Sequence, residues 1–385
     1  MPVSHYIKIM QPNGTVPFYI AQNPPGGDLT KGGFTNLVYN NVLSGFGTLK
    51  FSLYGGHLAL ATLIPYCQVE VWRTWPEMGI APYRDWSGLF LDEESSITAD
   101  GGDLFTLTCY GDAIQLADAA VAWPAGTANR SQFTNAKGET IMKTLVDYNC
   151  CTNATAANGR DETNQQAGLS IDTDGSNGNS LDWACANENL LNTLQNLATS
   201  ANAGGDFTLL KTGAAAWLFK WGQWNCYSGI TAQVSADRTA SVKFSLELGN
   251  MANPHYYNTR SNEKTVALVK GIGTGSDRAI AIRTGVNYSA SRKREIYVNA
   301  SSQATTTAAL NATGDAALKA SQAQEIIEFD ALPLPNIIYG KHWFLGDKVA
   351  VKYKSHSLTP RVVMVTTKPD PNQGEIITPG MAVNV

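Results

Sequence analysis

The sequence predicts an α+β fold that is mainly β, in which two strand-rich regions flank a helical middle region. Short alternating or β-branched runs fill residues 1–110 and return after residue 206. Two amphipathic helical patterns lie between these regions. Only 16% of the 385 residues are charged, whereas 43% are hydrophobic. This balance favours strands, turns and large subunit contacts over a solvated helical bundle.

Six strands are predicted in the N-terminal region, separated by Gly, Pro and Asn clusters. They are Tyr6–Met10, Phe18–Gln22, Gly47–Leu53, Cys67–Arg73, Gly88–Leu91 and Phe105–Tyr110. Strands at this spacing are typical of an antiparallel barrel or sandwich. Within 68–73 apolar residues take every second position, which predicts one buried face and one wet face. Residues 91–94 (Leu-Asp-Glu-Glu) are interpreted as an acidic strand end or turn.

The middle region is expected to be helical. Asp112–Ala119 has a helix-like composition, and Gly138–Asn149 carries Ile141, Leu145 and Tyr148 on one face. A further helix is predicted from Glu188 to Thr199. Residues 152–180 are rich in Asn, Thr, Gly and Asp, which predicts a long exposed loop.

The strand signal returns in the C-terminal part. The predicted strands are Phe207–Leu210, Ala215–Trp221, Val242–Leu248, Thr265–Lys270, Arg278–Thr284, Glu295–Val298, Lys348–Tyr353 and Arg361–Thr367. An Ala-rich stretch from Thr305 to Ala323 predicts a third helix, and a Pro/Gly segment ends the chain. The two strand-rich halves are compatible with one architecture used twice.

No catalytic, cofactor-binding or metal-binding residues are predicted. The motifs of serine hydrolases, zinc proteases, P-loop proteins and dinucleotide-binding proteins are absent from the sequence. Residues 271–275 (Gly-Ile-Gly-Thr-Gly) are interpreted as a hairpin turn rather than a phosphate loop. Residues 172–176 (Asp-Thr-Asp-Gly-Ser) resemble a calcium loop, but Asn177 and Trp183 stand where such a loop needs Gly and Glu. A flexible polar loop is therefore expected there.

Two other candidate sites are also assigned structural roles. Asp92, Glu93 and Glu94 are a candidate carboxylate pair for glycoside hydrolysis, but adjacent strand positions face opposite ways, so a solvated or channel-lining acidic edge is favoured. The five histidines are isolated in sequence from one another and from the cysteines. A Cys–His pair formed through the fold stays open, and ordinary core or surface roles are favoured.

Charge, cysteine usage and hydropathy limit the partners. The net charge is −4, and the densest basic cluster, Arg292–Arg294, is interpreted as a solvated loop rather than a nucleic-acid contact. The six cysteines (Cys67, Cys109, Cys150, Cys151, Cys185 and Cys226) form no zinc knuckle and are expected to be reduced. The absence of a signal-like start and of a long apolar run predicts assembly in a cytoplasm without a membrane span.

Several consecutive segments resemble a family of siphovirus tail or minor structural proteins, which are in turn similar to phage baseplate (tail) hub proteins. The segments are GFGTLKFSL (45–53), QVEVWR (68–73), DWSGLF (85–90), FTLTCYGD (105–112), VAWPAGTANRS (121–131), GETIMKTLVDYN (138–149), GGDFTLL (204–210), DRTASVKFSLELGNM (237–251) and GKHWFLGDKVAVKY (340–353). The element at Leu345–Val349 recurs among tail hub proteins. These positions look like turn glycines and core residues, so no functional residues carry over.

This resemblance implies a tail-tip hub. Residues 1–120 would form a tube-like β-barrel, 121–205 a helical and loop domain, and 206–385 a second tube-like domain with a helical insertion near 305–325. Three copies would form a pseudo-hexameric ring that continues the tail channel. The implied partners are a distal tail protein, tail fibre or tip proteins, and a tape measure protein in the lumen, without sequence-specific nucleic acid or a cofactor.

Two other functions are considered beside the hub. One is a tail-associated cell-wall-degrading enzyme, either a peptidase or a glycosidase. The other is a receptor- or sugar-binding module that uses the aromatic-rich stretch Trp217–Trp224. The roles of the 152–180 loop and of the pair Cys150–Cys151 are left open.

Overall fold

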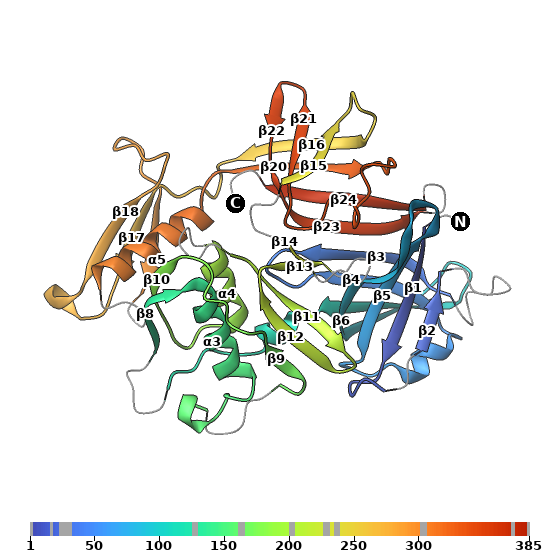
Figure 1. Cartoon of the computed structure of the whole chain (residues 1–385), viewed down its shortest axis with the longest axis horizontal. Coiled ribbons are helices and arrows are strands. Elements are labelled where there is room, and N and C mark those ends of the chain that lie inside the picture. Colours follow the sequence, from blue (N-terminus) through green and yellow to red (C-terminus); the bar gives the residue numbers. More distant parts are fainter. Residues whose placement is uncertain are drawn as a thin grey trace.

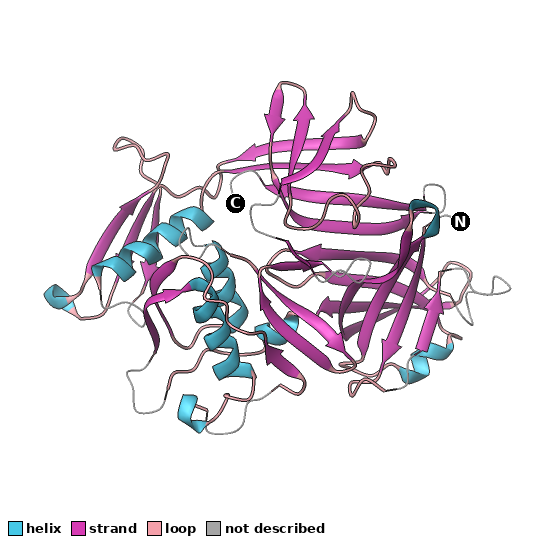
Figure 2. Ribbon diagram, in the orientation of Figure 1, coloured by secondary structure: helices cyan, strands magenta, loops and turns pink. Residues whose placement is uncertain are grey.

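The computed structural model describes residues 3–15, 18–22, 33–124, 130–160, 166–199, 205–225, 232–234, 239–300, 306–370 and 374–382. The fold is mainly β, as predicted. Two bodies of strands lie side by side, with helices gathered at one side of them (Figures 1 and 2). Among the described residues no helix is long and apolar enough to cross a membrane.

Seven N-terminal strands form what we call the first β module. They are β1 (Ser4–Met10), β2 (Phe18–Ala21), β3 (Thr35–Val42), β4 (Thr48–Tyr54), β5 (Gln68–Trp75), β6 (Ile80–Ile97) and β7 (Asp103–Gly111). Their order is β3-β4-β7-β6-β5-β1-β2, and all seven contribute side chains to, or pack against, one apolar core that includes Ile7, Phe51 and Val71. An isolated bridge joins Ala21, at the end of β2, to Gly33, just before β3. This single bridge connects segments next to the two end strands of the path.

The second β module is built from seven C-terminal strands. They are β15 (Thr239–Ser245), β16 (Met251–Thr259), β20 (Gln324–Ala331), β21 (Lys348–Tyr353), β22 (His356–Leu358), β23 (Arg361–Asp370) and β24 (Gly374–Ala382). Pairing follows the path β16-β20-β24-β23-β21-β15, and β22 pairs with β21. These strands enclose a separate core that includes Phe244, Phe329 and Trp343. The two strands at the ends of the path, β15 and β16, are joined by residues 246–250 alone.

The two modules share one sheet. Strand β23 pairs antiparallel with β3, with Val365 opposite Asn41 and Thr367 opposite Tyr39, and this ladder joins the modules into a single 14-stranded sheet. Figure 1 shows β23 and β24 lying along the upper edge of the first module. Closure of either module into a barrel, and the division at 120 and 205, stay predictions.

The middle region packs helices against two small sheets. Its elements are α2 (Ile114–Ala117), β8 (Ser131–Lys137), α3 (Gly138–Cys150), β9 (Leu169–Ile171), β10 (Ser180–Cys185), α4 (Leu190–Thr199), β11 (Phe207–Gly213) and β12 (Ala216–Trp221), followed by the hairpin of β13 (Gln223–Asn225) and β14 (Ala232–Val234). Leu145 of α3, Leu194 of α4 and Phe219 of β12 belong to one core. Strands β11 and β12 therefore pack with the middle region, although the predicted domains place them after residue 205.

An α/β unit, which we call the insertion, stands between β16 and β20. It consists of β17 (Val266–Lys270), β18 (Ile280–Thr284), β19 (Glu295–Asn299) and α5 (Thr307–Ala320). The helix covers one face of the sheet and shares a small core with it, which includes Val269 and Leu310. In Figure 1 the insertion lies at the opposite end of the molecule's long axis from β1 and β2. Short 3₁₀ turns occur at Leu58–Thr62, Pro76–Met78, Ala156–Asn158 and Gly275–Asp277.

Most predicted elements are present, and three expectations are corrected. Residues 91–94 are not a strand end, because β6 continues to Ile97 in a long hairpin with β7. The segment 152–180 is not wholly an exposed loop, because β9 runs beside β12 and Leu169 is buried in the core. The C-terminal Pro/Gly segment is strand β24, where Pro379 and Gly380 stand opposite Val365 and Met364.

Candidate functional site

The contact between the two β modules contains a buried group of polar and charged side chains, which we call the junction cluster. Its members are His5, Tyr39, Arg73, Tyr83, Asp85, Tyr339 and Glu375. The first five come from the first module, and Glu375 comes from β24 of the second. Strand register explains part of the arrangement, because Arg73 of β5 pairs with His5 of β1 on one side and with Tyr83 of β6 on the other. Side chains paired in this way lie on the same face of a sheet.

Arg73 and Glu375 form the centre of the junction cluster. Arg73 is fully buried, and its Nε lies 2.8 Å from Glu375 Oε2 while a second guanidinium nitrogen contacts Oε1. Arg73 Nη1 donates to the Tyr83 hydroxyl at 2.8 Å and to the Tyr339 carbonyl at 3.2 Å. This bidentate pair joins residues 302 positions apart in the chain. Each charge is thus compensated only while the two modules keep this relative position.

The electrostatics of the cluster favour the ionised carboxylate of Glu375. Burial alone raises the pKa of Glu375, but the charge and hydrogen bonds of Arg73, together with the nearby His5, lower it to about 2. His5 Nε2 lies 3.4 Å from Glu375 Oε2. Asp85 differs, because burial raises its pKa, and its carboxylate accepts a 2.7 Å hydrogen bond from Tyr39. The ion pair is therefore stable at neutral pH.

A second charged group fixes the first module to the middle region. Glu70, on the opposite face of β5 from the first module's core, lies 3.2 Å from Lys211 Nζ of β11 and 3.6 Å from Arg84. Its carboxylate also accepts a 2.8 Å hydrogen bond from Trp72 Nε1. Burial raises the pKa of Glu70, but Lys211 and the other partners bring it below its usual value. The outer face of Gln68–Arg73, predicted to be wet, is thus partly covered by β11.

A third polar contact joins the second module to the start of β11. Arg361 of β23 forms an ion pair with Asp206, which also accepts a 3.1 Å hydrogen bond from Ser44. The Arg361 Nε donates to the Gly346 carbonyl at 3.0 Å. Gly346 adopts a left-handed conformation, with φ of 90°, and belongs to the Leu345–Val349 element. This element therefore forms a turn that supports the contact.

A polar cavity of about 140 Å³ lies between these contacts. Its charged lining groups already have partners: Asp112 accepts from Ser87 and from Trp217 Nε1, while Arg84 donates to the Lys211 carbonyl. Burial raises the pKa of Asp112, whereas it lowers that of Lys211. The lining groups Asp112 and Arg84 are thus held by hydrogen bonds to other parts of the protein.

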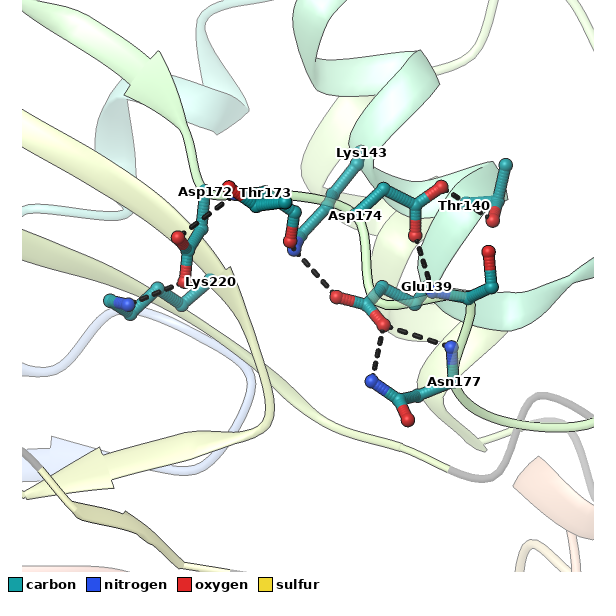
Figure 3. Close-up of polar contacts among 9 residues, drawn as sticks. Glu139, Thr140, Lys143, Asp172, Thr173, Asp174, Asn177 and Lys220 are labelled. Atoms are coloured by element: carbon teal, nitrogen blue, oxygen red, sulfur yellow. Dashed lines mark hydrogen bonds and ion pairs between the residues drawn. The ribbon is translucent and has the colours of Figure 1, made fainter.

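The calcium-like segment 172–177 is held by lysines and amides rather than arranged as a cation cage (Figure 3). Asp172 forms an ion pair with Lys220, and Lys143 Nζ donates to Glu139 at 2.6 Å and to the Thr173 carbonyl at 2.5 Å. The carboxylate of Asp174 accepts from the Thr140 hydroxyl at 2.7 Å. The polar groups of this segment thus tie it to α3.

The other residues considered as candidates in the sequence lie in separate parts of the fold. Asp92, Glu93 and Glu94 lie on the long β6–β7 hairpin, residues 271–275 connect antiparallel β17 and β18, and Arg292 and Lys293 are exposed. Trp217 is buried and bonded to Asp112, whereas the side chain of Trp224 lies outside the described residues.

The described cysteines are buried in the fold. The five described cysteines, Cys150 and Cys151 among them, are buried free thiols, and Cys226 lies outside the described residues. Burial raises the pKa of the Cys150 thiol to about 12. In the described part of the chain, no group of three or more His, Cys, Asp or Glu side chains is placed to hold a metal ion.

The junction cluster was not predicted from the sequence, although the pattern contained one indication of it. In Gln68–Arg73 the inward positions Val69 and Val71 are followed two residues later by Arg73, a charge where the alternation requires an apolar residue. Such a break indicates a buried charge that needs a partner. Glu375 lies in the segment interpreted as a tail, so no local pattern pointed to it.

The fold defined by these contacts is that of phage tail proteins. Along nearly their whole lengths, two solved structures are similar to the chain. The prophage MuSo2 43 kDa tail protein from Shewanella oneidensis shares 14% identity over 98% of this chain and 98% of its own, with a TM-score of 0.54. The tail protein from Neisseria meningitidis MC58 shares 10% identity over 99% and 97%, with a TM-score of 0.55. At these identities the likeness concerns the fold.

A family model identifies the sequence group. Residues 46–380 match the Siphovirus ReqiPepy6 Gp37-like protein family, so the chain belongs to that family. A search of curated proteins gave no match. The predicted membership of a siphovirus tail protein family is thereby confirmed, and the chain is a structural protein of phage-tail type.

Replacing Glu375 tests the junction cluster. Glu375→Gln leaves the buried Arg73 charge uncompensated, and we expect the free energy of unfolding to fall by about 3–5 kcal/mol. Denaturant titration followed by circular dichroism measures the change. The double variant Arg73→Met/Glu375→Leu removes both charges, so its free energy of unfolding should fall less than that of Glu375→Gln. An equal fall in the free energy of unfolding in the two variants would contradict charge compensation between Arg73 and Glu375.

The lowered pKa of Glu375 predicts how the stability of the fold depends on pH. The pKa of Glu375 is 4.5 in the unfolded chain and about 2 in the folded one. Its contribution to the free energy of unfolding is therefore complete above about pH 4.5 and is lost as the pH falls toward 2. Thermal melting between pH 7 and pH 2 should show this loss in the natural chain. The loss should be smaller in Arg73→Met/Glu375→Leu, and identical pH profiles would exclude Glu375 as its source.

Calcium is not expected to affect the 172–177 segment. Asp172 is held by Lys220, and Asp174 accepts from Thr140. We therefore expect the melting temperature to be the same with millimolar CaCl₂ and with a chelator. A calcium-dependent rise that disappears in Asp174→Asn would instead identify a cation site.

Proposed function

We propose that the chain is a tail-tip hub protein whose three copies form a pseudo-hexameric ring around the tail channel. The observation that carries this proposal is the presence, in one chain, of two strand modules that each wrap around a separate core. Three copies would then present six modules, which is the number needed to continue a sixfold tube. The proposed localisation is the tail tip of the virion.

The way each module curves supports a tube-like barrel. The Ala21–Gly33 bridge brings the two ends of the first module together, and a five-residue connection (246–250) brings the two ends of the second together. We propose that both modules close into barrels, since a closed barrel has no exposed strand edges that would pair with other chains. The proposed domains are accordingly 1–120, 121–205 and 206–385, with a tube-like barrel in the first and third.

The fixed relation between the modules also supports a ring subunit. The β3–β23 ladder and the buried Arg73–Glu375 pair both cross the junction. A ring that alternates two kinds of module needs one constant angle between them in every copy. We propose that the distal tail protein lies above this ring, that fibre or tip proteins lie below it, and that the tape measure protein and then DNA pass through it.

The proposed role is not enzymatic. The buried ionisable groups of the junction are bound to one another, as Arg73 is to Glu375 and Glu70 is to Lys211. A general acid or base must instead have access to a substrate proton. Zymography of the pure chain on host cell walls tests this part, and lysis by the protein would favour the tail-associated peptidase or glycosidase.

Reconstruction of assembled tails by electron cryo-microscopy tests the hub proposal. The expected result is three copies of this chain in one ring on the tail axis, with their six β modules around the lumen. A position away from the axis, or a copy number other than three per ring, would overturn it. The same map would show whether the neighbouring rings are the proposed partners.

A further inference from the structure

We propose that the face of the β17–β19 sheet opposite α5 is a subunit contact that binds the β6–β7 hairpin of a second copy of this chain. This inference rests on the proposed ring. A ring built from identical chains in head-to-tail contact needs two different and complementary surfaces on each chain. The sheet face and the hairpin supply such a pair.

The face of the sheet opposite α5 exposes several apolar side chains. Helix α5 packs on one face, where Ala267, Val269 and Ala281 are buried. The alternate residues point the other way, and there Ile280, Ile282 and Tyr297 are 66%, 63% and 62% exposed. Single exposed apolar residues are common on protein surfaces. Several on one face of a small sheet indicate an interaction surface.

Strand register shows that these residues form one continuous surface. Leu268 of the central strand β17 stands opposite Ile282 of β18 on one side and opposite Tyr297 of β19 on the other. The row Ile282–Leu268–Tyr297 therefore crosses the whole sheet. Ile280 lies two residues from Ile282 on the same face. Val286, in the loop that follows β18, is fully exposed and extends the apolar area.

A basic loop borders this face. Residues 285–294 connect β18 to β19 and contain Arg292, Lys293 and Arg294 but no acidic residue. Arg292 and Lys293 are exposed, whereas the Arg294 guanidinium donates to the Arg260 and Ser261 carbonyls. The two exposed cations therefore stand at the edge of an apolar surface, and a partner that carries an apolar side chain among carboxylates fits them.

The β6–β7 hairpin of the first module has this chemistry. Residues 92–103 contain five acidic residues and no basic one, and Glu93 and Glu94 are exposed. Ile97 lies near the hairpin tip and is 75% exposed. Strand β5 pairs with β6 as far as Leu89, and Phe90 still bonds to Tyr66 and Cys67. Beyond Phe90, no described strand pairs with this edge of β6. Ile97 would pack against the sheet face while the carboxylates meet Arg292 and Lys293.

The positions of the two surfaces favour contact between copies. The insertion and the first module lie at opposite ends of the long axis (Figure 1). One chain therefore cannot bring its own hairpin onto its own insertion without a large rearrangement. Between neighbouring copies in a ring, the hairpin of one reaches the insertion of the next, and each copy uses both surfaces once.

Charge reversal on the full-length chain tests this contact. Glu93→Lys/Glu94→Lys and Arg292→Glu/Lys293→Glu should each weaken trimer formation by at least about tenfold, because like charges then face each other. The combination of all four substitutions should restore it. Sedimentation velocity over a range of protein concentrations measures the association. Lys354→Glu/Lys368→Glu is the matched control, since both lysines are exposed on the second module.

The apolar part of the contact is tested by Ile282→Glu, with Leu248→Glu as the control at another exposed position. Ile282→Glu should also weaken association, whereas Leu248→Glu should leave it unchanged. Circular dichroism melting confirms that each variant is folded. A natural chain that forms trimers while the charge and Ile282 variants associate equally well overturns this contact and leaves the ring intact. A natural chain that stays monomeric at every concentration overturns the ring and this contact with it.

Discussion

The buried ion pair between Arg73 and Glu375 is the constraint on which the arrangement of the chain depends. A guanidinium and a carboxylate removed from water cost several kcal/mol each unless they are paired with good geometry. Here one partner lies on β5 of the first module and the other on β24 of the second. Any displacement between the modules would separate the charges. The pair therefore specifies one relative position, and the apolar cores on either side supply the stability.

The same division of roles extends to the middle region. Glu70–Lys211 joins the first module to β11, and Arg361–Asp206 joins the second module to the segment just before β11. Apolar contacts are not directional, so they tolerate sliding. Hydrogen-bonded ion pairs are directional, so they select one alignment. The two β modules and the middle region, each with its own core, are thus fixed to one another by a few oriented polar contacts.

Local patterns account for what the sequence could predict. Helix α3 was expected at Gly138–Asn149 and lies at Gly138–Cys150, because the spacing of Ile141 and Leu145 is decided within the helix itself. Strand β24 was missed because Pro379 and Gly380 are typical of loops, and only pairing with β23 makes them part of a sheet. The junction cluster was missed for the same reason, since Arg73 and Glu375 meet only after both modules have folded.

The exposed surfaces differ from the buried contacts in where their charged and apolar residues lie. Inside the chain, charges such as Arg73 and Glu375 lie among other polar groups of the junction, where a displaced module would leave both uncompensated. On the surface, apolar residues such as Ile282 and Tyr297 are exposed, and the loop that follows β18 carries the exposed charges of Arg292 and Lys293. The proposed ring subunit needs this combination, because it must hold its own modules rigidly and bury its remaining apolar area against a neighbour. In the proposed ring, the rigidity of the junction would allow a contact at one end of the chain to set the position of the next copy.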